Sequence, residues 1–350
     1  MQRCCSVKEV VELNWRQSML IFGGIILASC SNHTSAQVEE GIPVLRYQGT
    51  ANTVMPWELA DDLGYMNGIK LEWIGDGTSG PESIQATMTG DVEFGGAFNG
   101  AILQLHYAGA GVTSVIHYYG SDEETYAGYY VLEDSPIQEA DDLIGGNVGV
   151  NTLGAHHEFS TVEYARQNGL SKSQVDDIGR IIIPPASGEQ ALRSGQLEVT
   201  TLSGIIRDKA LETGGLRPLF KDIDLFGPFN AGSIVFRDDY IEEQPEAVEI
   251  FVNGMARAIE WMKENEAEIV RERMREIVET RGRNEQTDLI DYWKSSGIES
   301  PGGAIRQVDF ERWEDWLVEE GRISKGETQM EEVYTNRFNP YFNELEEGNE

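Results

Sequence analysis

Cysteine is absent from the chain after residue 30. The only three cysteines among the 350 residues are Cys4, Cys5 and Cys30. A domain that begins after them has no disulfide and depends on a hydrophobic core for its stability. A chain of this length can bury such a core, and it has room for two domains.

Basic residues are also scarce. Lysine and arginine together number 27 against 60 aspartates and glutamates, which gives a formal net charge of −33. So acidic a surface argues against nucleic acid and anionic lipid headgroups as partners. The hydrophobic content of 40% and the aromatic content of 9% are those of a globular protein.

Motifs of catalysis and of nucleotide binding are missing too. The sequence has no Gly-x-Ser-x-Gly elbow, no Gly-rich phosphate-binding loop and only five histidines. His156 and His157 are followed by Glu158, but adjacent side chains on a helix point about 100° apart. No third metal ligand is spaced to converge with them. We therefore expect no enzyme, no metal site and no cofactor.

The first 29 residues are predicted to be a secretory signal peptide. Basic residues precede an apolar run over residues 19–27, which is too short to span a bilayer. The run ends in Leu27-Ala28-Ser29-Cys30, which resembles the bacterial lipobox, whose cysteine is acylated. We expect an exported protein in the periplasm or at the cell surface, anchored by lipid on Cys30, with residues 30–41 as a polar tether. An ordinary signal peptide with a chance cysteine is the alternative.

An internal repeat with an offset of 105 positions indicates the architecture. Residues 84–94 align with residues 189–199, so that Gly90 falls on Gly195. The same offset places Gly64 on Gly169. Each copy has the pattern of a helix, a glycine stop and a short buried strand. The sequence therefore predicts two copies of one α/β unit.

Strand patterns alternate with helical patterns in both halves, which predicts parallel sheets built from right-handed βαβ units. The fold class that we predict is α/β, with two doubly wound lobes joined by a two-strand hinge and a pocket between them at the carboxyl ends of the strands. Lobe 1 is assigned to residues 42–127 and 235–345, and lobe 2 to residues 128–234. The predicted strands are residues 44–48, 70–74, 92–95, 114–119, 126–132, 147–150, 180–184, 197–201 and 232–237.

The segment after residue 245 has the pattern of a long amphipathic helix. Its apolar residues recur at helical spacing, at positions 248, 251, 252, 255, 259 and 262. Since no further strand pattern follows, this helical tail is predicted to pack on lobe 1. The arginines and glutamates of residues 271–283 are interpreted as a solvated helix face.

Three segments resemble one family of binding proteins. They read YVLEDSPI at residues 130–137, DDLIGGNVGV at 141–150 and ALRSGQLEVTTL at 191–202. These are similar to motifs of the periplasmic proteins that bind aliphatic sulfonates, taurine, nitrate or pyrimidine precursors of thiamine. The resemblance covers about residues 44–248 and implies a type II periplasmic-binding fold that delivers a small solute to an ABC permease. We expect a monomer, with the ATPase on a separate subunit.

The sequence departs from the sulfonate binders in two places. Leu202-Ser203-Gly204-Ile205 stands where a Trp-Asp-Pro-like segment is frequent, and Gly146-Asn147 replaces a basic pair. Both departures weaken a sulfonate assignment and leave the expected fold unchanged.

Candidate ligand-binding residues lie in the loops that precede the predicted helices. Free backbone N–H groups at helix N-termini bind anions, glycines allow close approach, and hydroxyls add donors. The candidates are Gln48, Thr50, Ser79, Gly80, Phe98, Asn99, Thr152, Gly154, His156, Ser187 and Ser203.

The expected solute is a small polar or anionic molecule of the sulfonate, taurine or nitrate kind, although the sequence does not require an anion. No lysine or arginine lies between Lys70 and Arg166, so an anion in lobe 1 would depend on backbone amides. Four or five hydrogen bonds of roughly 1.5–3 kcal/mol each could supply micromolar binding. The alternative ligand is a neutral or cationic heterocycle stacked on Tyr47, Trp57 or Phe98. The alternative function is that of a sensing adaptor, which presents its ligand to a receptor.

Overall fold

The computed structural model describes residues 41–324, 326 and 329–343. The predicted signal peptide, Cys30 and nearly all of the predicted tether lie outside the described residues. The ten described strands form three sheets, with the orders β1-β2, β3-β10-β4 and β7-β6-β8-β5-β9. They are β1 Val44–Gly49, β2 Lys70–Asp76, β3 Phe94–Phe98, β4 Val112–Ser121, β5 Ala127–Leu132, β6 Asn147–Val150, β7 Gly179–Ile182, β8 Val199–Ser203, β9 Leu216–Lys221 and β10 Phe229–Arg237.

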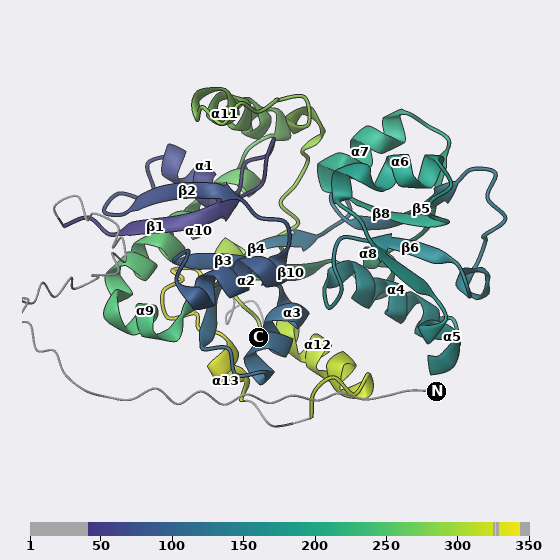
Figure 1. Ribbon diagram of the computed structural model, residues 1–350. Helices are drawn as coiled ribbons and strands as arrows, with labels where there is room; N and C mark the ends of the chain where they lie inside the picture. The colour runs from purple at the N-terminus through teal and green to yellow at the C-terminus, as the bar shows by residue number, and fades with distance from the viewer. Residues whose placement is uncertain (1–40, 325, 327–328, 344–350) are drawn as a thin grey trace, which may run out of the picture. The chain divides into compact units, whose positions relative to one another are not determined.

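Helices pack around these sheets, as Figure 1 shows. They are α1 Pro56–Asp62, α2 Gly80–Thr89, α3 Asn99–Tyr107, α4 His156–Gln167, α5 Lys172–Asp176, α6 Gly188–Arg193, α7 Gly204–Glu212, α8 Asp222–Phe226, α9 Asp238–Glu243, α10 Pro245–Glu264, α11 Ala267–Thr280, α12 Val308–Glu319 and α13 Met330–Val333. No helix among the described residues is long and apolar enough to cross a membrane.

The two smaller sheets belong to one lobe. The backbone N–H of Glu93 donates to the carbonyl of Arg46 at 3.1 Å, which joins β1 to the segment that leads into β3. The five-stranded sheet forms the second lobe, drawn in teal in Figure 1. The chain passes from one sheet system to the other between β4 and β5 and returns before β10. The predicted two-lobed α/β fold is therefore confirmed. The prediction that the sheets are parallel throughout was wrong, because β5 and β10, the strands that follow each crossing between the lobes, run antiparallel to their neighbours.

The exact lobe boundaries remain a prediction. β10 pairs along its length with β3 and β4, both antiparallel. The boundary that we placed between residues 234 and 235 falls inside this strand. β9 was not predicted, because Gly214 and Gly215 precede it and Pro218 interrupts its apolar pattern.

The repeat corresponds to matching turns in the two lobes. Gly90 follows α2 with φ 76°, and Gly195 follows α6 with φ 73°. Gly64 and Gly169, after α1 and α4, have φ 73° and 90°. In this left-handed region a glycine closes a helix without the steric cost of a Cβ atom. The offset found in the sequence thus marks equivalent helix ends.

The helical tail packs on lobe 1 through α10. Its apolar stripe is buried at all six predicted positions, and α10 lies against α1. Burying each such side chain contributes about 1.5–3 kcal/mol before the entropy of folding is subtracted. α12 packs on α3 but also reaches lobe 2, where the rings of Trp316 and Phe159 stack 3.8 Å apart. The tail therefore contacts both lobes.

Candidate functional site

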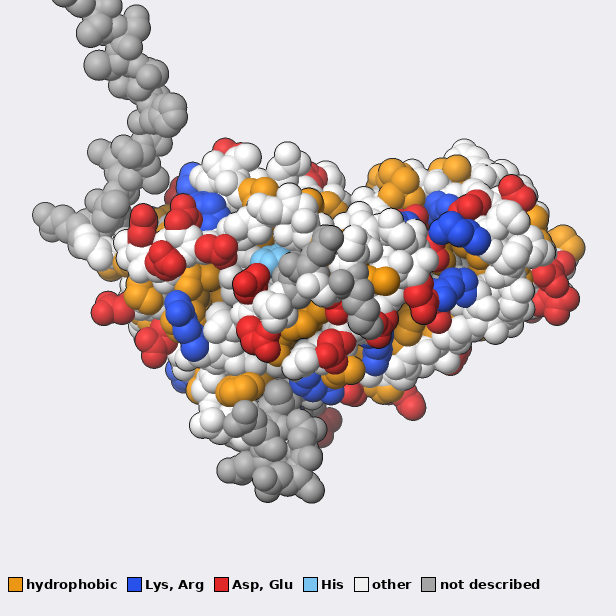
Figure 2. Space-filling view, turned by 90° about the horizontal axis from the view of Figure 1, so that it is seen from below, with side chains coloured by type: hydrophobic (Ala, Val, Ile, Leu, Met, Phe, Trp, Pro, Cys, Tyr) orange, Lys and Arg blue, Asp and Glu red, His pale blue; other side chains and the backbone are white. Residues whose placement is uncertain are grey.

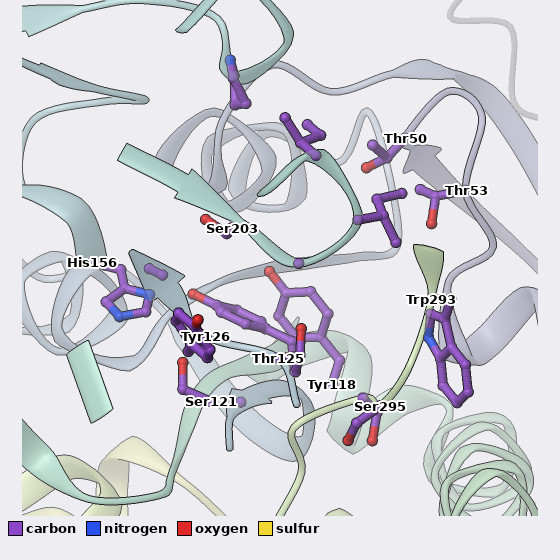
Figure 3. A pocket seen from close by; sticks show the side chains of 18 of the residues that line it. Thr50, Thr53, Tyr118, Ser121, Thr125, Tyr126, His156, Ser203, Trp293 and Ser295 are labelled. Atoms are coloured by element: carbon purple, nitrogen blue, oxygen red, sulfur yellow. The ribbon is translucent and has the colours of Figure 1, made fainter. Parts of the chain in front are cut away.

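A cavity of about 460 Å³ lies between the two lobes, where loops follow the carboxyl ends of strands. Parallel α/β sheets place ligands at this edge, and the volume suits a small molecule. Figure 3 shows side chains from both lobes around the cavity, among them Thr50, Tyr118, His156, Ser203 and Trp293.

The wall of the cavity is rich in aromatic rings. Phe98 at the end of β3 stacks on His156 at the start of α4, with ring centroids 5.2 Å apart and 7° between the planes. This contact joins the two lobes. Tyr126 also lines the cavity, and the guanidinium of Arg207 lies 3.7 Å from its ring centroid. A flat ligand would meet ring faces and edges here.

His156 lies beside a buried carboxylate. Its Nε2 is 3.0 Å from Oδ2 of Asp222, and the Ser121 hydroxyl donates to the same oxygen at 2.6 Å. The two groups lie within ion-pair distance, and the Nε2 atom is buried. His156 therefore contributes its ring, which stacks on Phe98, to the wall of the cavity.

His157 fixes the orientation of Ser203. The N–H of Asn151 donates to His157 Nδ1 at 3.4 Å, and burial together with neighbouring His156 lowers the His157 pKa to about 3. The ring is thus neutral with its proton on Nε2, which lies 3.2 Å from Ser203 Oγ and donates to it. The Ser203 hydroxyl proton remains available to a ligand.

Charged groups at the cavity are few and mostly acidic. Glu124, Asp208 and Lys294 line it, and Lys294 Nζ is paired with Asp208 at 2.9 Å. No arginine belongs to the described residues that line this cavity. An anionic solute would therefore lack a free cationic side chain.

One wall comes from residues 281–296, which we call the strap. At its start Arg281 and Arg283 bind the two oxygens of the buried Glu58 in α1, at 3.0 and 2.7 Å. Farther along, Lys294 reaches Asp208 in α7 of lobe 2. The strap thus contacts both lobes and places Trp293 and Ser295 at the cavity. Our interpretation of residues 271–283 as a wholly solvated face was wrong, because these two arginines neutralise a buried carboxylate.

A side chamber of about 290 Å³ adjoins the cavity in lobe 1. It is lined by Gln48, Ser79 and Gly80 at the N-terminus of α2, and by Trp57. The indole nitrogen of Trp57 and Oε1 of Gln48 are buried and have no hydrogen-bond partner in the described part of the chain. The chamber therefore offers one donor and one acceptor to a polar substituent of the solute.

The structure places the predicted site residues in three groups. Thr50, Gly80, Phe98, Thr152, His156 and Ser203 line the main cavity. Gln48 and Ser79 line only the side chamber. Asn99, Gly154 and Ser187 line neither: Asn99 is fully buried and donates to the carbonyls of Asn230 and Asp309.

Several cavity residues were not predicted. Tyr118, Tyr126 and Trp293 lie in a strand, a crossing segment and the strap, where an aromatic residue has no local signature of binding. Tyr47, which we considered as a stacking platform, is only 4% exposed and packs in the core of lobe 1.

A search against family profiles matches residues 52–269, more than half of the chain, to the NMT1/THI5-like family. The chain belongs to this family. A search of curated proteins finds no match. The matched range includes both halves of the cavity wall from α1 to α7, and the strap lies beyond it.

Solved structures of the same fold resemble this family member at low identity. The periplasmic aliphatic sulphonate binding protein SsuA from Escherichia coli is 18% identical, with a TM-score of 0.64 over 85% of this chain and 92% of that one. The periplasmic nitrate-binding protein NrtA from Synechocystis PCC 6803 is 11% identical, with a TM-score of 0.67 over 88% and 89%. The desulfurization enzyme DSZB is 14% identical, with a TM-score of 0.59 over 87% and 99%. These likenesses establish the periplasmic-binding fold.

Metal ligation was also considered. The described residues contain no group of three or more His, Cys, Asp or Glu side chains placed to hold a metal ion. The rings of His156 and His157 are 5.8 Å apart and inclined by 48°. His157 is already engaged with Asn151 and Ser203.

Proposed function

We propose that this protein is an extracytoplasmic solute-binding protein that holds a small planar solute, neutral or cationic, in the interlobe cavity and delivers it to an ABC importer. The observation that carries the proposal is the composition of the wall, whose described residues include stacked rings such as Phe98 and His156 and acidic groups but no arginine. Ring faces attract flat and cationic ligands. The shared fold and the family membership support the transport role.

A small anion such as a sulfonate or nitrate is the second candidate. The sulphonate-binding and nitrate-binding proteins of the same fold favour this candidate. The N-terminus of α7 favours it too, because its residues Gly204, Ile205 and Ile206 line the cavity. Backbone N–H groups there could bind an oxyanion. Burial of an anion beside Glu124 and Asp208 opposes this candidate, because Lys294 is already paired.

Binding is favoured over catalysis by the state of His157. Ser203 and His157 are in hydrogen-bond contact, as in a nucleophile with its base. A histidine whose pKa is about 3 has little tendency to take a proton from serine at neutral pH. The pair therefore suits a fixed hydroxyl for ligand recognition.

The melting temperature of the protein, measured with ligands of each candidate class, tests which class of solute it binds. We expect 4-aminopyrimidines to stabilise the protein, by about 2.7 kcal/mol at a concentration 100-fold above their dissociation constant. Taurine, ethanesulfonate and nitrate should leave the melting temperature unchanged. Stabilisation by taurine or nitrate, with none by the pyrimidines, would instead establish the second candidate.

Anchoring through Cys30 completes the proposal. The protein should incorporate labelled palmitate and sediment with membranes, and the Cys30→Ser variant should do neither. The Cys5→Ser variant serves as the control and should still incorporate palmitate. Labelling that survives in Cys30→Ser would show that the lipobox resemblance is accidental.

A further inference from the structure

A further cavity, of about 420 Å³, lies between α12 and the lobe 2 helices α4 and α8. We call it the α12 cavity. The interlobe cavity shares none of its lining residues. Three of its walls are the rings of Phe226, Trp313 and Trp316. α12 is near the lower edge of Figure 1, and Figure 2 views the molecule from that side, where acidic side chains are scattered over the surface.

One donor in this cavity is unused and a second is weakly engaged. Among the described residues the indole nitrogen of Trp316 has no hydrogen-bond partner, although the residue is only 5% exposed. Arg312, one helical turn earlier on the same face, also lines the cavity. Its guanidinium donates a long 3.4 Å bond to the carbonyl of Phe226 and lies 5.6–5.9 Å from the ring centroids of Phe226, Phe229 and Trp313. It has no carboxylate within ion-pair distance among the described residues. Burial lowers the pKa of this arginine, and the charge of Asp309 only partly opposes that effect.

The carboxylates of the cavity are already engaged. Glu163 and Glu319 both bind Arg166, the former with 3.4 Å between Oε2 and Nη1. Asp315 also has an interaction partner. A half-buried arginine with no carboxylate partner among the described residues, beside an indole N–H with none either, can bind an anion.

We infer that the α12 cavity binds a small aromatic carboxylate or a similar flat organic anion. The anionic group pairs with Arg312 and accepts a hydrogen bond from the indole of Trp316. The flat body packs against Phe226 and Trp313. The volume lies within the range of small-molecule sites. Such an occupant contacts α12, which packs on lobe 1, and α8 of lobe 2 at the same time.

The site also adjoins the wall of the interlobe cavity. The ring of Trp313 is 4.6 Å from that of Phe98, which stacks on His156. The inference does not rest on the proposed solute, because no group of the interlobe cavity takes part in the contact with the anion.

Titration of the full chain with benzoate tests the inference. In the NMR spectrum, the Trp316 indole N–H resonance is identified as the one that the Trp316→Phe variant lacks. As benzoate is added to the wild type, this resonance should shift and reach a plateau. Arg312→Met should weaken benzoate binding by at least about tenfold, the loss of one charge-assisted hydrogen bond. Arg257→Met is the matched control, since this exposed arginine stacks on Tyr65 and should bind benzoate normally.

Two further measurements test the charge of the ligand and the location of its site separately. Benzylamine, of similar shape and opposite charge, should bind more weakly than benzoate. A Ser203→Tyr variant, altered only in the interlobe cavity, should bind benzoate like the wild type. An unmoved Trp316 resonance, equal affinities in Arg312→Met and Arg257→Met, or tighter binding of benzylamine would each overturn the inference. Circular dichroism confirms that each variant is folded.

Discussion

Ser203→Tyr is expected to weaken solute binding by at least about 100-fold, equivalent to ~2.7 kcal/mol. Ser203 lies at the end of β8, with its hydroxyl beside His157 and facing the interlobe cavity. A phenol ring at this position would fill space that the solute requires. The side chain of Ser203 does not cap α7, so its replacement removes no helix-capping bond. The variant does remove the acceptor of the His157 Nε2–H, so the unliganded protein should lose about 1–3 kcal/mol of stability and remain folded.

Two companion variants separate loss of space from loss of a hydrogen bond. Ser203→Ala keeps the cavity and removes one neutral hydroxyl, so calorimetric titration should show a loss of about 3- to 10-fold. Ser173→Tyr adds the same ring on the exposed surface of α5 and should leave binding unchanged. Full affinity in Ser203→Tyr would show that the solute binds elsewhere.

His117→Leu is expected to lower the free energy of unfolding by about 3–5 kcal/mol. His117 in β4 is fully buried, and its Nε2 lies 3.0 Å from Oδ2 of Asp309. Ser233 donates its hydroxyl proton to Asn99, so its oxygen must accept from His117 Nδ1 at 2.9 Å. Both ring nitrogens therefore donate, and the imidazole is positively charged. Leucine would leave a buried carboxylate without this cation.

A surface ion pair supplies the comparison. Asp239→Asn removes an exposed carboxylate paired with Arg237 and should cost less than about 1 kcal/mol. The double variant His117→Leu/Asp309→Leu removes both buried charges and should recover part of the loss. Chemical denaturation of the four proteins measures these differences. Equal stability of His117→Leu and Asp239→Asn would show that the buried pair is not charged.

The contribution of Asp309 to the free energy of unfolding should decrease at acidic pH. Burial raises its pKa, but His117 and Arg306 outweigh burial and hold the pKa of this carboxyl well below its usual range. Above the ordinary aspartate pKa, about 3.9, both folded and unfolded forms are ionised, so the stabilisation is complete. It is lost as the pH falls below that value, because only the unfolded chain then takes up a proton. The part of the stability difference between wild type and Asp309→Asn that comes from the aspartate should therefore shrink below about pH 4.

Much of the fold could be predicted from local patterns. The repeat at Gly90 and Gly195 located two matching helix ends, because left-handed helix stops leave a recognisable glycine. The stripe of α10 was visible because helical periodicity depends only on neighbours along the chain. β9 was missed, since a proline hides an edge strand from such patterns.

The residues of the site could be predicted from the sequence less completely than the fold. Loops at strand ends could be named, and six of the eleven candidates line the cavity. The partnership of Glu58 with Arg281 and Arg283 joins residues more than 220 positions apart, so no local pattern shows it. Trp293 lies in the same strap and lines the cavity without any local sequence signature of binding. Asn99 has a loop signature like the others, but the fold engages its amide in the buried network around Asp309.

A crystal structure with a bound 4-aminopyrimidine is the most direct measurement of where and how the solute binds. Our account predicts ring density in the interlobe cavity, between the Phe98–His156 pair and Trp293, with a polar atom of the ring bonded to Ser203. Density for the ring on the outer surface of either lobe, with the interlobe cavity holding only water, would contradict it.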